Sequence, residues 1–139
     1  MPVTLAEGID FKKDGYPTFI TNVTGMSVYE PWGGRWTDGE KATFVFKKPL
    51  PKHFKLVIKA QSFGPNGLEP LKIKIGSAQK EITIAGNPEI YALSFECKKS
   101  VNTIEFIVPK PSSPAELKIP GNNDIRKLGI AFHYLKIVR

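Results

Sequence analysis

The chain has 139 residues, 41% hydrophobic and 11% aromatic, which is enough for one folded domain with its own core and excludes a disordered chain. No stretch approaches the roughly 20 consecutive apolar residues that a membrane-spanning helix needs, so none is expected. The net charge of +7, from 20 basic and 13 acidic residues, leaves anionic lipid head groups, nucleic acid and acidic glycans open as partners.

Short apolar runs separated by Gly and Pro predict strands throughout the chain. No window has the 3.6-residue apolar period of an amphipathic helix. Nine Phe, four Tyr and two Trp also favour strands. The predicted strands cover residues 17–24, 41–47, 54–61, 71–75, 80–84, 90–96, 102–108 and 128–138.

Alternation of side chains predicts which residues point into the core. The inward sets are Phe54, Leu56, Ile58 and Ala60; Leu71, Ile73 and Ile75; Tyr91, Leu93 and Phe95; and Ile104, Phe106 and Val108. The strand at 128–138 is apolar on both faces, which indicates a central strand or one that is covered on both sides. Lysines alternate with the apolar residues in 54–61 and 71–75, a pattern that fits either protection of sheet edges or an anion-binding surface.

About eight antiparallel strands without a helix predict an all-β, jelly-roll-like β-sandwich of the galactose-binding type. The segments 25–40 and 109–127 are too long for hairpins, so we expect them to cross between sheets. We find no internal repeat and no linker, and residues 1–139 are therefore predicted to form a single domain.

The residues that usually carry catalysis or bind metal are sparse and scattered. His53 lies in a predicted turn and His133 within a strand, and both are interpreted as satisfied polar residues rather than bases. The lone cysteine, Cys97, follows an alternating run and is expected to be a buried, inert residue at a strand end. With no clustered ligands, nucleophile elbow or phosphate-binding loop, the sequence predicts no enzyme, no metal and no cofactor.

The stretch YEPWGGRWT at 29–37 is the densest group of aromatic and charged residues around glycine. A tryptophan in a jelly-roll loop either stacks its π face on a sugar ring or closes the end of the core. Trp36 leads into the next strand, which favours a core cap, whereas Trp32 fits either role equally. Tyr29 adds a third aromatic side chain to the same stretch.

Charged residues accompany these aromatics in two places, at 29–37 and in NNDIRKLG before the last strand. Glu30 and Arg35 fit either an ion pair that fixes the loop or a pair that binds sugar hydroxyls. Asp124 and Arg126 present the same choice. A glycosidase pair of Glu30 and Asp124 has only weak support, because the sequence cannot set the separation of the two carboxyl groups.

Four segments in order, GMSVYEPWGGRWTDGEKATFVFKKPLP at 25–51, FGPN at 63–66, the Pro-rich VPKPSSP and DIRKLGIAF, resemble a known module. It is the uncharacterised C-terminal β-sandwich of phosphoglycerol-transferase-like and glycosyltransferase-like envelope proteins of Gram-negative bacteria. One departure is Gly34, which lengthens the turn by one residue. The resemblance implies the fold and an envelope location, and says little about activity. The matching positions are Gly25, Ser27, Glu30, Trp32, Gly33, Arg35, Trp36, Thr37, Asp124, Arg126, Leu128 and Gly129.

The sequence therefore predicts a non-catalytic accessory module that binds a cell-envelope glycan and works with a linked or partner membrane transferase. The expected ligand-binding residues are Tyr29, Glu30, Trp32, Arg35, Trp36, Asp124 and Arg126. The alternative is a structural or protein–protein interaction module without a small ligand. Nucleic acid is disfavoured because the aromatics of the basic strands point inward. The N-terminus lacks a signal-peptide pattern, so the chain as given is expected to be soluble, and periplasmic or membrane-associated within a larger protein.

Overall fold

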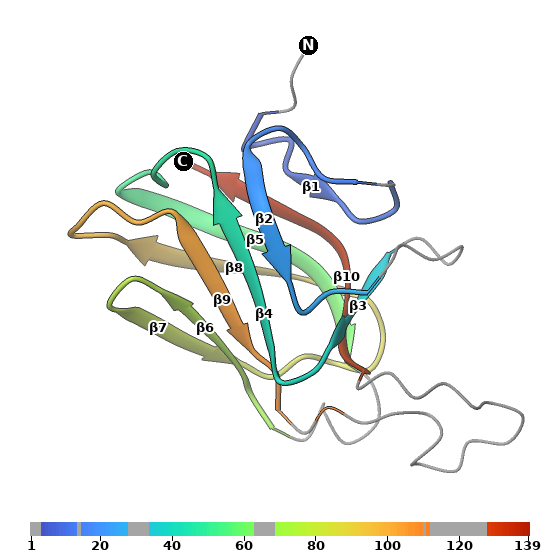
Figure 1. Cartoon of the computed structure of the whole chain (residues 1–139). Helices are drawn as coiled ribbons and strands as arrows, with labels where there is room; N and C mark the ends of the chain where they lie inside the picture. Colours follow the sequence, from blue (N-terminus) through green and yellow to red (C-terminus); the bar gives the residue numbers. More distant parts are fainter. Residues whose placement is uncertain (1–3, 14, 28–33, 63–68, 110, 112–127) are drawn as a thin grey trace, which may run out of the picture.

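Two antiparallel β-sheets pack face to face in the computed structural model (Figure 1). The structure describes residues 4–13, 15–27, 34–62, 69–109, 111 and 128–139. No helix is present among these residues. The predicted all-β sandwich is therefore confirmed, with ten strands rather than about eight.

The first sheet has the order β1-β10-β5-β8, with β3 also paired to β10. β10 is one of the two central strands of this sheet, in agreement with its two apolar faces, and it has a strand on either side over most of its length. The strands are β1 (Ile9–Asp10), β3 (Arg35–Asp38), β5 (His53–Ser62), β8 (Glu89–Glu96) and β10 (Leu128–Val138).

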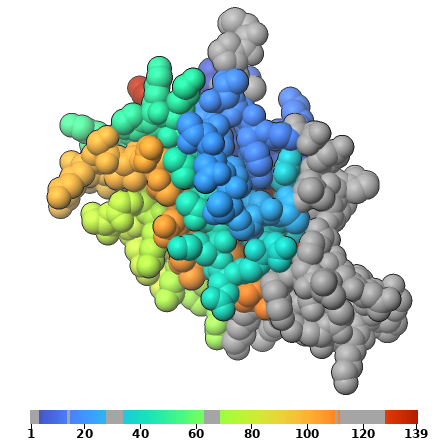
Figure 2. Space-filling view, in the orientation of Figure 1, coloured from blue at the N-terminus to red at the C-terminus, as the bar shows by residue number. Residues whose placement is uncertain are grey.

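The second sheet has the order β2-β4-β9-β6-β7. In Figure 2 the blue, teal, orange and yellow-green surface of this sheet faces the viewer, and the first sheet lies behind it. Its strands are β2 (Ile20–Thr24), β4 (Lys41–Phe46), β6 (Leu71–Ile75), β7 (Ala78–Ile82) and β9 (Thr103–Ile107).

The core between the sheets is lined by the residues that alternation predicted. The inward residues of β5, β6 and β9 are buried, whereas on β8 only Phe95 is fully buried and Tyr91 and Leu93 are half-buried. Phe106 of the second sheet and Phe132 of the first join the two layers, with ring centroids 5.0 Å apart. Cys97 is a free, buried thiol whose pKa is raised by burial, as expected for a structural cysteine.

The two strands that the sequence did not predict are β1 and β3. β1 has only two residues, and β3 has Arg35 and Thr37 rather than apolar residues on its inward face. β3 lies inside the segment 25–40 that we expected to be a loop, and only its pairing with β10 makes it a strand. β7 begins at Ala78 rather than residue 80, because a two-residue turn at Gly76 and Ser77 joins it to β6.

Gly25 allows the chain to turn from β2 toward β3. It has a φ of 80°, and a Cβ there would collide with the Lys41 carbonyl of the neighbouring strand β4. Its own carbonyl accepts a hydrogen bond from the Asp38 amide at 2.8 Å. Glycine is needed here for both the positive φ and the close backbone approach, so this turn sets how β3 meets β10.

We predict that Gly25→Ala lowers the free energy of unfolding by about 1–3 kcal/mol more than Gly15→Ala does, because overpacking adds to backbone strain. Gly15 is the matched control, since its φ is also 80° but no atom lies within 4 Å of a Cβ built there. Urea denaturation of the two variants measures the difference. Equal losses of unfolding free energy in the two variants would mean that the close approach of an added Cβ to β4 has no energetic cost.

Candidate functional site

The residues proposed from the sequence as a binding site lie in two stretches, 29–37 and 124–126, and the structure describes only Arg35 and Trp36 among them. Tyr29, Glu30 and Trp32, together with Asp124 and Arg126, lie outside the described residues. Arg35 and Trp36 are adjacent in β3 and therefore project from opposite faces of the first sheet.

Arg35 points toward the core side and is 7% exposed. One terminal nitrogen donates hydrogen bonds to the carbonyls of Lys13 at 3.1 Å and Gly15 at 3.5 Å, and the other donates to Ser27 at 3.4 Å. The guanidinium also lies over the Tyr16 ring, 4.7 Å from its centroid. Arg35 therefore ties two separate stretches of main chain, at residues 13–15 and at Ser27, to β3. These hydrogen bonds offset part of the cost of burying its charge.

Tyr16 is the aromatic partner of this arginine and belongs to the aromatic core. Its ring makes edge contacts with Phe11 and Phe44, with centroids 6.2 Å and 6.4 Å apart. Burial raises the pKa of the Tyr16 phenol, and the nearby positive charge of Arg35 partly opposes this rise. The phenol is therefore neutral at physiological pH, and its ring attracts the arginine through its π face.

Trp36 lies on the outer face of the first sheet, is half-buried and is not among the residues packed against the core, so the expectation that it caps the core is wrong. Trp36 is paired with Ala131 on β10, and Ala131 is in turn paired with Gln61 on β5. Residues paired in this way share a face, so Trp36, Ala131 and Gln61 form one row across three strands, here called the Trp36 row. The Trp36 carbonyl accepts hydrogen bonds from the Ser27 amide at 2.9 Å and the Ser27 hydroxyl at 3.2 Å, which orients this end of the row.

His133 is next to the Trp36 row and lies at a β-bulge, where the register between β10 and β5 shifts. Its Nε2 is 3.1 Å from Gln61 Oε1. Burial lowers the pKa of His133, and the positive charges of Lys59 and Lys12 lower it further. The imidazole is therefore neutral at pH 7, as expected for a satisfied polar residue, and it lies in a positive field.

A hollow of about 310 Å³ opens beside His133 on this outer face. The Lys136 ammonium lies over the Tyr134 ring in the hollow, 4.7 Å from its centroid. Tyr134 is paired with Asp10 on one side and with Lys59 on the other. The hollow thus combines an aromatic ring, ammonium groups and carboxylates; its lining residues are Glu7, Ile9, Asp10, Lys12, Lys59, His133, Tyr134 and Lys136.

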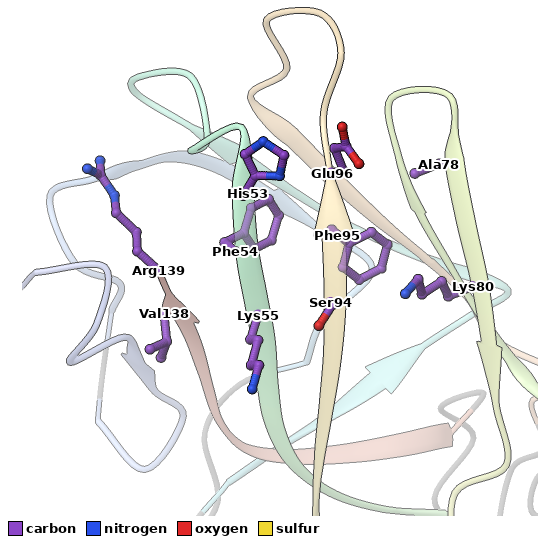
Figure 3. Close-up of a pocket in the computed structure, with 10 residues that line it drawn as sticks. All are labelled: His53, Phe54, Lys55, Ala78, Lys80, Ser94, Phe95, Glu96, Val138 and Arg139. Atoms are coloured by element: carbon purple, nitrogen blue, oxygen red, sulfur yellow. The ribbon is translucent and has the colours of Figure 1, made fainter.

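A larger hollow of about 720 Å³ lies at one end of the sandwich, where β5, β7, β8 and the end of β10 come together (Figure 3). Phe54 and Phe95 stack there with centroids 5.8 Å apart, and Lys80 of β7 lies 5.4 Å from the Phe95 centroid. Both rings are only 4% exposed. This hollow therefore offers little aromatic surface to a ligand. We favour the Trp36 row as the candidate binding site.

Sequence reasoning did not single out Gln61, Tyr134 or Lys136, and it treated His133 only as a satisfied polar residue. Alternation did place the lysines of β5 on the outer face. It could not pair β10 with β5, and this pairing brings Lys59 beside Tyr134.

Two negative results apply to the described part of the chain. It contains no group of three or more His, Cys, Asp or Glu residues arranged to hold a metal ion. It also contains no helix long and apolar enough to cross a membrane.

We predict that Arg35→Met lowers the free energy of unfolding by about 2–4 kcal/mol, because it leaves main-chain carbonyls without their charged donor. The exposed Arg139→Met serves as the control and should change stability by about 0.5 kcal/mol or less. Urea denaturation compares the two, and equal effects would show that Arg35 does not brace the fold.

Comparisons with known proteins identify the family. The family described as "Domain of unknown function (DUF7024)" matches residues 3–139. Phosphoglycerol transferase I of Salmonella paratyphi B and of Salmonella typhi is 32% identical over 136 residues, which are 96% of this chain. The chain spans about 18% of the length of these relatives, and the predicted resemblance to a module of phosphoglycerol-transferase-like proteins is confirmed.

Solved structures with the same fold are family 29 carbohydrate-binding modules. A mutant of one such module has a TM-score of 0.61 at 15% identity, with 95% of this chain and 89% of that chain covered. Mutants in complex with mannohexaose and cellulohexaose both have TM-scores of 0.60, at 15% and 14% identity; they cover 94% of this chain and 88% and 87% of theirs. This chain thus shares its fold with family 29 carbohydrate-binding modules, and it belongs to the DUF7024 family.

Proposed function

We propose that this domain is a non-catalytic module that binds a glycan of the cell envelope. The observation that carries the proposal is the backbone likeness, over 94% of the chain, to modules solved with bound hexasaccharides. The identity of 14–15% is too low to transfer binding residues, so the site must be argued from this chain.

The Trp36 row supplies the chemistry that a sugar ring needs. A half-buried indole offers a π face for stacking, and Gln61 offers both a donor and an acceptor for hydroxyl groups. In this proposal Tyr29 and Trp32 stack beside Trp36, while Glu30, Asp124 and Arg126 bind hydroxyls or an acidic group. Arg35 acts from beneath, since its hydrogen bonds to main-chain carbonyls position the strand that presents Trp36.

The relatives suggest where such a module works. Phosphoglycerol transferase I contains a similar segment within a much longer protein. We propose that this module holds a glycan near a linked or partner transferase in the cell envelope. Affinity is expected to be modest, because a few hydrogen bonds and one or two stacked rings must offset the cost of ordering the ligand.

One observation favours a second candidate, a structural or protein–protein module without a small ligand. The buried Arg35 and its three main-chain carbonyls form the kind of brace that this alternative requires. The two candidates differ in the role of Trp36. In the structural candidate its indole only packs against neighbouring protein groups on the outer face and does not contact a ligand.

We predict that mannohexaose or cellulohexaose shifts the Trp36 indole signal of the ¹⁵N-labelled domain in an NMR titration. Trp36→Ala should lower the affinity by about tenfold or more, because the stacking of the sugar ring on the indole is lost. The same variant should change the free energy of unfolding by about 1 kcal/mol or less. Phe19→Ala is the control; this half-buried ring stacks on Phe46 beside the second sheet and should affect stability but not binding.

The structural candidate predicts the opposite result for Trp36→Ala: sugars have no effect, and stability falls by more than about 1 kcal/mol because the packing of a half-buried indole is lost. Absence of any shift near residue 36 at millimolar concentrations of both hexasaccharides, and of the acidic sugars glucose 6-phosphate and glucuronate, would reject the stacking site.

A further inference from the structure

Three lysines gather on the outer face of the first sheet, on its two central strands. Lys55 and Lys59 lie on β5, and Lys136 lies on β10 opposite Val57, which is between them. Lys136 is therefore a diagonal neighbour of both, at the roughly 7–8 Å typical of such pairs. We call Lys55, Lys59 and Lys136 the lysine cluster.

No member of the lysine cluster has a carboxylate directly opposite it. The cross-strand partners of Lys55 are Val138 and Ser94, and those of Lys59 are Tyr134 and Ile90. Neither β5 nor β10 contains an acidic residue. Carboxylates of the flanking strands are only diagonal to the cluster: Asp10 is opposite Tyr134, and Glu96 is opposite His53. The three like charges are therefore only partly compensated, and their repulsion favours a bound anion.

The outer face of the second sheet is an internal comparison, because its lysines are arranged differently. Lys72 is directly opposite Glu81, and Lys74 is directly opposite Glu105. Lysines that only keep a sheet soluble can be interleaved with carboxylates, as they are on this face. The first sheet lacks this interleaving on its central strands, which points to a different use of its lysines.

The hollow beside His133 gives the lysine cluster a concave surface. Lys59 and Lys136 line it together with Lys12, which follows β1. Two carboxylates also line it, and both already accept hydrogen bonds. Asp10 accepts from the Lys12 amide at 3.0 Å, and Glu7 accepts from Thr4 at 3.1 Å and 3.2 Å. These local bonds hold the carboxylates at the rim of the hollow but leave their charges in place. The lining therefore has three ammonium groups against two carboxylates and keeps an excess of positive charge.

We propose that the lysine cluster and this hollow form an anionic subsite, so that the glycan bound at the Trp36 row carries a phosphate or a carboxylate group. The inference rests on the proposed glycan-binding function and specifies its ligand as an acidic glycan. His133 and Gln61 connect the hollow to the Trp36 row through their contact at 3.1 Å. A sugar ring on Trp36 and its anionic substituent near Lys59 thus lie on one continuous face.

His133 reports on the charge in this subsite. The groups around it are Lys59 on β5, Lys12 and Asp10 at β1, Glu7 before β1, and Tyr134 and Lys136 on β10. The charges of Lys59 and Lys12 contribute to the lowered pKa of the imidazole. A bound anion offsets these positive charges and therefore raises the pKa of His133.

The test is an NMR titration of the whole domain with inorganic phosphate, glucose 6-phosphate, glucuronate and glucose, at constant ionic strength. We expect phosphate and at least one acidic sugar to raise the pKa of His133 by about half a unit or more, and glucose to leave it unchanged. The two acidic sugars distinguish a phosphate ligand from a carboxylate ligand. No rise with phosphate or with either acidic sugar overturns the inference.

Two double variants remove the same amount of charge from opposite faces. Lys59→Ala with Lys136→Ala should weaken phosphate binding by about tenfold, because both ammonium groups lie in the hollow. Lys72→Ala with Lys74→Ala is the matched control on the second sheet and should change it by less than about twofold. Equal losses would show that net charge alone attracts the anion, and would also overturn the inference.

The neutral hexasaccharides separate this inference from the proposed function. If they bind through Trp36 and phosphate leaves His133 unchanged, the domain binds a neutral glycan and only the anionic subsite is rejected. If phosphate acts on His133 but neither neutral nor acidic sugars affect Trp36, the glycan-binding proposal is rejected, and with it the claim that the anion belongs to a glycan.

Discussion

The arrangement of the whole domain depends on the pairing of β10 with three other strands. β1 and β3 pair along one of its edges and β5 along the other. On the inner face, Phe132 of this strand packs against Phe106 of the second sheet and against Phe11, with centroids 5.0 Å and 5.6 Å apart. On the outer face, the same strand carries Tyr134 and Lys136. One strand thus joins the core to the proposed binding face.

Order at the Trp36 end of the domain comes from polar interactions rather than from hydrophobic packing alone. The Thr37 hydroxyl is fully buried and accepts a hydrogen bond from the Ile130 amide at 2.9 Å. Arg35 holds main chain from both sides of β2, and Gly25 lets that chain approach β4 closely. Buried polar groups require defined partners, so these contacts permit one arrangement of β3 and set the orientation of the strand beneath Trp36.

The two outer faces of the sandwich differ in charge pattern, and this difference indicates which face is the proposed binding face. One face alternates lysines with glutamates across neighbouring strands. The other combines Trp36, Gln61, Tyr134 and the lysine cluster on a few adjacent strands. Aromatic stacking and ammonium groups on the same face suit a sugar that carries negative charge. The fold that this chain shares with family 29 carbohydrate-binding modules does not set the ligand, so the proposed specificity rests on these side chains.

The sequence by itself determined the fold class, the eight longer strands and nearly all of the inward residues. Alternation is a local property of the chain, so the burial of Phe54, Leu56, Ile104 and Phe106 could be predicted without knowing strand order. Within the proposed site, the sequence singled out Arg35 and Trp36, but not their opposite faces, because it did not show that they lie in a strand.

Only the tertiary structure decided which outward residues become neighbours. β3 is a strand because β10 supplies its hydrogen-bonding partner, and no apolar pattern marks it in advance. Tyr134 meets Lys59, and Lys136 lies between Lys55 and Lys59, through a register that contains a bulge at His133. Register depends on long-range pairing and on the shape of the core, and a bulge shifts it by one residue. Local sequence does not contain this information, so the lysine cluster became visible only in the folded domain.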